Sequence, residues 1–161
     1  MINSPTGLLV PTTEGDDLIL SRTFHAPIED VWASVTESDR TARWFGPWVG
    51  EAGPGHTIRV QMAHEDQAPW VDVRVDACDP PRRLAVSTTG PGGWRIELLL
   101  SHTDGQTELR LVHHLPTRDG IGEVGPGWEY YLDMLVAARA SSPVPRFDDY
   151  YPTMKPLYEA L

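Results

Sequence analysis

The most constraining feature of this sequence is a stretch in which apolar and polar residues alternate with a period of two. Between His56 and His114 there are five such runs, HTIRVQMAHE, WVDVRVDAC, RRLAVSTT, WRIELLLSH and TELRLVHHL. Alternation of this kind places every second side chain on the same face of a β-strand. Gly, Pro and Asp residues between the runs predict turns, and short turns join antiparallel neighbours. The stretch therefore predicts an antiparallel meander with one apolar and one polar face.

Three shorter elements precede the meander. Residues 17–25, DLILSRTFH, alternate in the same way and bring the predicted sheet to six strands. Pro27 suits the first turn of a helix, and the apolar residues after it recur at helical spacing. A second short helix is predicted over residues 38–44, before Gly46 and Pro47 interrupt the chain.

One long helix follows the meander. Residues 117–126 are rich in Gly and predict no regular element, whereas Pro126 suits a first helical turn. Apolar residues then fall on one helical face as far as Ala138. The order of strand, two short helices, five strands and long helix matches an α+β helix-grip fold. In it, a six-stranded curved antiparallel sheet wraps around the C-terminal helix.

The length of 161 residues suits a single domain. We expect a flexible N-terminal arm over residues 1–15, because Pro and Gly recur there without a sustained period. The domain itself is expected over residues 16–142. Residues 143–161 are expected to form a tail that packs on the domain, with too many prolines for a long helix.

Net charge and composition limit the classes of binding partner and the cellular location that we expect for this protein. The formal net charge is −10, from 23 acidic and 13 basic residues. Nucleic acids and anionic membranes both require a basic surface, so we expect neither as a partner. No segment approaches the ~20 apolar residues that span a bilayer, and the N-terminus lacks a signal-peptide pattern. Cys78 is the single cysteine, which is typical of a reducing compartment. We therefore expect a cytoplasmic protein.

Three motifs resemble the signature stretches of a known family. They are RTFHAPIEDVW (residues 22–32), RWFGP (residues 43–47) and GPGWEYYLDML (residues 125–135). These motifs are similar to those of the AHSA1-like family (activator of Hsp90 ATPase homologue) in the START-like, or SRPBCC, superfamily. The resemblance covers roughly residues 17–139 and implies the helix-grip fold with a cavity between sheet and helix. It does not fix an activity, because members share a fold more than a function.

No catalytic machinery or metal site emerges from the sequence. There is no G-x-S-x-G motif and no recognisable triad of nucleophile, base and orienting group. His113 and His114 are adjacent on a predicted strand, so they point to opposite faces and do not share one ion. We expect no metal and no other cofactor, and the sequence favours a binding protein over an enzyme.

The cavity between sheet and helix is the predicted site. His113 shares the parity of the apolar strand residues, and convergent polar groups among apolar walls are typical of ligand pockets. The predicted ligand-binding residues are Trp44, Phe45, Met62, His64, Trp94, His113, Trp128 and Tyr131.

Three functions of different classes are compatible with the predicted fold and cavity. The first is binding of a small hydrophobic or aromatic molecule in the cavity. The second is a cyclase or dehydratase of the polyketide type, with a cavity His or Tyr as general acid or base. The third is an Hsp90-type co-chaperone that acts through its outer surface. A homodimer is a further partner that the sequence permits.

Overall fold

The computed structural model describes residues 4–88, 90 and 93–161. Within them, eight antiparallel strands form one sheet in the order β1-β2-β8-β7-β6-β5-β4-β3. The strands are β1 (Leu8–Thr12), β2 (Gly15–Phe24), β3 (Trp48–Val49), β4 (Thr57–Gln61), β5 (Trp70–Asp79), β6 (Arg83–Ser87), β7 (Arg95–Thr103) and β8 (Gln106–Leu115). The helices are α1 (Ile28–Thr36), α2 (Ser38–Thr41), α3 (Ile121–Ala140), the 3-10 helix η1 (Phe147–Asp149) and α4 (Lys155–Glu159).

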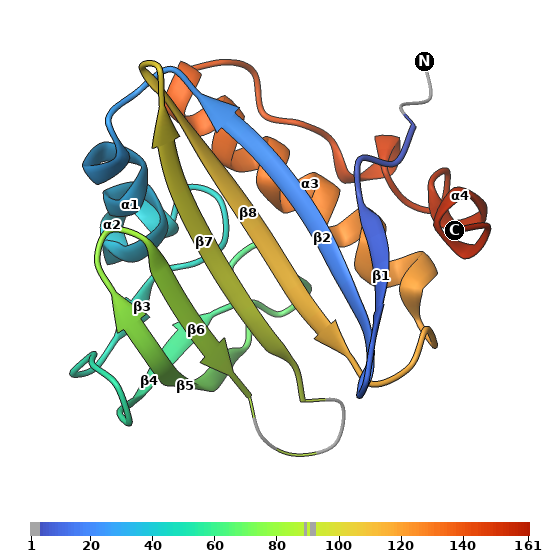
Figure 1. Ribbon diagram of the computed structural model, residues 1–161, viewed down its shortest axis with the longest axis horizontal. Coiled ribbons are helices and arrows are strands. Elements are labelled where there is room, and N and C mark those ends of the chain that lie inside the picture. The colour runs from blue at the N-terminus through green and yellow to red at the C-terminus, as the bar shows by residue number, and fades with distance from the viewer. Residues whose placement is uncertain (1–3, 89, 91–92) are drawn as a thin grey trace.

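The sheet curves around α3, which lies behind β2 and β8 in Figure 1. The short helices α1 and α2 lie on one side of α3, and α4 lies on the other side near β1. Among the described residues, no helix is both long and apolar enough to cross a membrane. The predicted α+β architecture, with a curved antiparallel sheet around a long C-terminal helix, is confirmed.

The prediction of six strands is wrong, because β1 and β3 add two edge strands. β1 lies within the residues expected to form a loose arm and pairs with β2 along its whole length. The hairpin depends on Gly15, whose φ is +149° and where a Cβ would lie 2.1 Å from the Leu115 carbonyl oxygen. β3 has only two residues, too few to show a period in the sequence.

The long helix begins at Ile121, before the predicted start near Pro126. Gly122 and Gly125 lie in its first turns, where a Cβ would collide with side chains of α4. These glycines therefore allow the helix and α4 to approach closely, and packing outweighs their low helix propensity. Pro126 is accommodated inside the helix, although its ring removes one backbone donor.

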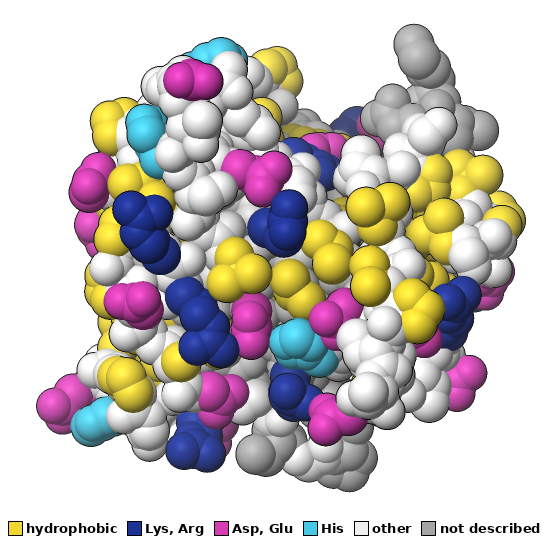
Figure 2. Space-filling model, viewed as in Figure 1, with side chains coloured by type: hydrophobic (Ala, Val, Ile, Leu, Met, Phe, Trp, Pro, Cys, Tyr) yellow, Lys and Arg dark blue, Asp and Glu magenta, His cyan; other side chains and the backbone are white. Residues whose placement is uncertain are grey.

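Alternation along the strands forms the core as predicted. Most inward-facing residues of the meander are buried and most of their neighbours are half-buried or exposed, although the inward Leu84 and Val86 are half-buried and the outward Ala85 and Val112 are buried. The inward set includes Val73, Val75, Ile96, Leu98, Leu109 and Leu111. Figure 2 shows the opposite, solvent-facing side of the sheet, where charged side chains of both signs are interspersed with apolar ones.

A buried carboxylate connects α3 with both ends of the described chain. Glu129 is 2% exposed and accepts hydrogen bonds from Thr6 N and Oγ1, the Tyr158 hydroxyl and Arg22 Nη2, at 2.6–2.9 Å. Burial alone raises the pKa of a carboxyl group, but these donors hold the pKa of Glu129 below its usual value. Arg22 also donates from Nε to Asp133 Oδ1 at 3.0 Å. This polar clamp fixes the position of α3 against β2.

Candidate ligand-binding cavity

A cavity of about 200 Å³ lies between the sheet and the helical side of the molecule. Its first wall consists of inward-facing side chains of strands β4 to β8. Register places many of them directly opposite one another, as in the row Val75, Val86, Ile96 across three strands. The residues of this wall are Ile58, Val60, Val73, Val75, Cys78, Leu84, Val86, Ile96, Leu98 and Leu111.

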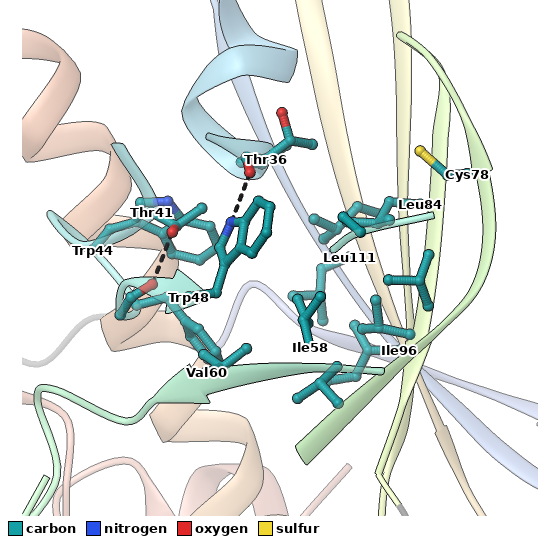
Figure 3. Close-up of a pocket in the computed structure, with 18 of the residues that line it drawn as sticks. Thr36, Thr41, Trp44, Trp48, Ile58, Val60, Cys78, Leu84, Ile96 and Leu111 are labelled. Atoms are coloured by element: carbon teal, nitrogen blue, oxygen red, sulfur yellow. Dashed lines mark hydrogen bonds between the residues drawn. The ribbon is translucent and has the colours of Figure 1, made fainter. Parts of the chain in front are cut away.

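The second wall comes from the end of α1, from the segment between α1 and β4, and from one residue of α3. Figure 3 shows Trp44 and Trp48 on one side of the cavity, with Ile58, Leu84 and Ile96 on the other. Phe45 stacks on Trp128 of α3 with their ring centroids 6.0 Å apart. The remaining members of this wall are Val35, Thr36, Thr41, Gly46, Ala52 and Gly53, and Trp94, the residue before β7, completes the lining. Ala52 is exposed, which places the mouth of the cavity at the β3–β4 loop.

Polar atoms of the wall are directed away from the cavity. The Thr36 and Thr41 hydroxyls donate to the Trp32 and Gly46 carbonyl oxygens, each at 2.8 Å. The Trp48 indole in turn donates to the Thr36 carbonyl oxygen, also at 2.8 Å. The polar groups of Thr36, Thr41 and Trp48 are therefore satisfied within the protein, and the cavity presents mainly hydrocarbon and ring faces.

Other indole donors are also engaged. Trp44 Nε1 donates to the Ser34 carbonyl oxygen at 2.9 Å, and Trp128 Nε1 donates to His113 Nδ1 at 3.0 Å. For Trp94 Nε1, no acceptor lies among the described residues. The contacts of Trp44, Trp48 and Trp128 direct their N–H groups to protein acceptors, so these three indoles line the cavity with their rings.

Four of the eight predicted site residues line the cavity. They are Trp44, Phe45, Trp94 and Trp128. The other four lie elsewhere, because β4 ends at Gln61 and because α3 covers part of the sheet. Met62 packs on the small cluster of Ile58, Val60 and Val73, and His64 is exposed in the turn that follows β4.

His113 has the predicted inward orientation but lies behind Trp128. It continues the row of Val86 and Ile96 across the sheet and is 7% exposed. Burial, with a smaller effect of His114, lowers the pKa of His113 to about 4. Because Nδ1 accepts the Trp128 hydrogen bond, the neutral ring carries its proton on Nε2. His113 therefore positions Trp128 and does not itself line the cavity.

Tyr131 also faces away from the cavity. Its hydroxyl donates to Glu65 Oε2 at 2.7 Å, and its ring packs against Phe45 with centroids 5.0 Å apart. Burial and the adjacent carboxylate raise the pKa of Tyr131 above its usual range. The hydroxyl is therefore protonated at neutral pH and connects α3 with the β4–β5 turn.

Several lining residues, including Cys78 and Trp48, were not predicted from the sequence. Alternation from Val73 and Val75 places Cys78 on the outer face, but a β-bulge between Val75 and Ala77 reverses the parity. Cys78 consequently pairs with Leu84 and faces inward. Burial and Asp79 raise the pKa of its thiol. Trp48 follows the RWFGP motif directly in the sequence. This position beside a motif that lines the cavity was the signal by which Trp48 could have been predicted as a lining residue.

In the described part of the chain, no three His, Cys, Asp or Glu side chains are grouped in a way that could hold an ion.

Solved structures with the same architecture include CalU16 from Micromonospora echinospora. Its crystal structure is 27% identical, with a TM-score of 0.79, and the match covers 99% of this chain and 98% of that chain. DynU16, a protein of the dynemicin biosynthetic locus, is 23% identical with a TM-score of 0.68, covering 81% of this chain and 50% of that one. A protein of unknown function from Enterococcus faecalis is 18% identical with a TM-score of 0.74, covering 96% and 88%. The last two similarities concern the fold alone.

The family comparison agrees with the motifs in the sequence. No curated protein matches this chain. The model of the family described as "Activator of Hsp90 ATPase homolog 1-like protein" matches residues 25–139, which is more than half of the chain. The chain therefore belongs to the AHSA1 family.

Proposed function

We propose that this protein binds a small, largely apolar molecule in the cavity between the sheet and the segment from α1 to β4, which Trp128 of α3 also lines. The observation that carries the proposal is an apolar space of about 200 Å³ whose hydroxyl and most indole donors are used internally. Apolar cavities of about 150 Å³ in proteins stay dry and bind benzene. A cavity of this size and lining favours hydrophobic ligands, because filling it gains dispersion contacts at little desolvation cost.

The test is binding of 2-acetylnaphthalene, a neutral two-ring probe, measured by isothermal titration calorimetry. The critical variant is Val86→Phe, which places a ring inside the cavity. Val49→Phe is the matched control, because Val49 is 53% exposed and does not line the cavity. We expect one saturable site in the unmodified protein and in Val49→Phe, and loss of binding in Val86→Phe. Equal binding by all three proteins would contradict the proposal.

Catalysis by the predicted His and Tyr residues receives less support from the geometry. His64, His113 and Tyr131 all lie outside the cavity lining, and two of them are engaged with protein partners. A co-chaperone role remains the alternative that the family description suggests. Stimulation of Hsp90 ATPase activity that is equal in Val86→Phe would favour that alternative, because it would not need the cavity.

The domain limits, location and oligomeric state stay predictions. We propose that residues 16–142 form the ligand-binding unit, with residues 143–161 packed on it. A cytoplasmic location and a homodimer are further expectations. Fractionation of the source cells and sedimentation equilibrium of the purified chain test them.

A further inference from the structure

The charge of the side chains that line the cavity restricts the charge of the ligand that the cavity can bind. None of the described residues that line the cavity carries a charge, although the sequence has 36 acidic and basic residues in all. We propose that the ligand is a neutral molecule with an aromatic ring system, and that the cavity rejects carboxylates of the same shape. This inference rests on the proposed function and specifies its ligand class.

The inventory of hydrogen-bond donors supports the exclusion of anions. A buried carboxylate needs a cation or several donors, as Glu129 in this protein illustrates with four of them. In the cavity, the donors of Thr36, Thr41, Trp44, Trp48 and Trp128 are bonded to protein acceptors. Among the side-chain donors of the described lining, only the indole N–H of Trp94 and the weakly donating thiol of Cys78 remain.

One neutral donor is enough for a carbonyl group but not for a carboxylate. A ligand carbonyl can accept a hydrogen bond from Trp94 and keep its rings in the apolar space. A carboxylate at the same place would lose its hydration without an opposing charge. The uncharged lining therefore disfavours an anion.

The shape of the lining supports an aromatic ligand. Five aromatic side chains line the cavity, namely Trp44, Phe45, Trp48, Trp94 and Trp128. Aromatic faces and edges pack favourably on other rings beyond the simple burial of area. The volume of about 200 Å³ exceeds the roughly 150 Å³ that accommodates benzene, so it fits a ring system somewhat larger than a single ring.

The test compares two isosteric probes, 2-acetylnaphthalene and 2-naphthoate, by calorimetry at pH 7.5. Both carry the same rings and a substituent of the same shape, but only 2-naphthoate is charged. We expect 2-naphthoate to bind at least 100-fold more weakly than 2-acetylnaphthalene. The titrations are repeated at two salt concentrations, because a difference caused only by the acidic surface would shrink at high salt, whereas a desolvation penalty in the cavity would persist.

Each result has a distinct meaning. A smaller difference in affinity, with both probes lost in Val86→Phe, would overturn the neutral-ligand inference and leave cavity binding intact. A difference that disappears at high salt would also overturn it. Binding of neither probe, or binding that Val86→Phe leaves unchanged, would overturn the proposed function itself.

Discussion

The imidazole of His113 is neutral around pH 7, because burial lowers its pKa to about 4. Its Nδ1 accepts the hydrogen bond that orients Trp128, so the neutral form is the one that the cavity wall requires. In the unfolded chain the same group has an ordinary pKa near 6.5. As the pH falls below 6.5, the unfolded state therefore binds a proton that the native state does not, and native stability decreases until about pH 4.

The variant His113→Gln tests this linkage, because its amide oxygen can still accept from Trp128 but does not titrate. Between pH 7.5 and pH 4, the unmodified protein should lose about 3 kcal/mol more free energy of unfolding than His113→Gln. Urea denaturation at a series of pH values measures the difference. Parallel pH profiles for the two proteins would show that His113 does not titrate as described.

Glu129 is a second buried titratable residue, and its role is to hold α3. Glu129→Gln keeps the shape but replaces one acceptor oxygen by a donor amide, which leaves donors of Thr6, Tyr158 or Arg22 unpaired. We expect a loss of about 3 kcal/mol of unfolding free energy, measured by chemical denaturation. Glu123→Gln is the control on the same helix, because Glu123 is exposed and its ion pair with Lys155 contributes little. Equal effects of the two substitutions would contradict the role of Glu129.

At the scale of elements, Gly125 is the tighter of the two glycines at which α3 contacts α4. A Cβ at Gly125 would lie 2.3 Å from Cδ1 of Tyr158, whose ring is fully buried. Gly125→Ala should therefore cost about 1–3 kcal/mol and expose the tail to limited proteolysis. Gly127 has no atom within 4 Å of its Cβ position, so Gly127→Ala should stabilise the helix by about 0.5–1 kcal/mol. Thermal unfolding compares the two, and a tail that stays protease-resistant in Gly125→Ala would contradict this packing.

These contacts also explain which elements could be predicted from the sequence. The central strands are visible because each has one buried face, which imposes a period of two. The start of α3 cannot be recognised in the sequence, because its glycines suggest a loop. Only the packing of the Tyr158 ring on Gly125 explains why glycines occur in this helix. The edge strand β1 has mostly exposed residues, including Leu8 and Val10, so its sequence carries little periodic signal.

At the scale of the whole molecule, the position of the cavity could be predicted better than its lining. The family motifs and strand parity indicated a space between sheet and helix, and four aromatic residues were placed correctly on its wall. Parity gives the direction of a side chain but not what covers it, which is why His113 lies behind Trp128. The inward position of Cys78 depends on a bulge, which alternation alone does not reveal.

The most direct test of ligand binding locates the probe in the molecule. Intermolecular nuclear Overhauser effects between 2-acetylnaphthalene and the protein methyl groups should appear at Ile58, Ile96 and Leu111 on the cavity wall. Contacts confined to exposed methyls such as those of Leu8 and Val144 would show surface association and contradict the assignment of the cavity as the site.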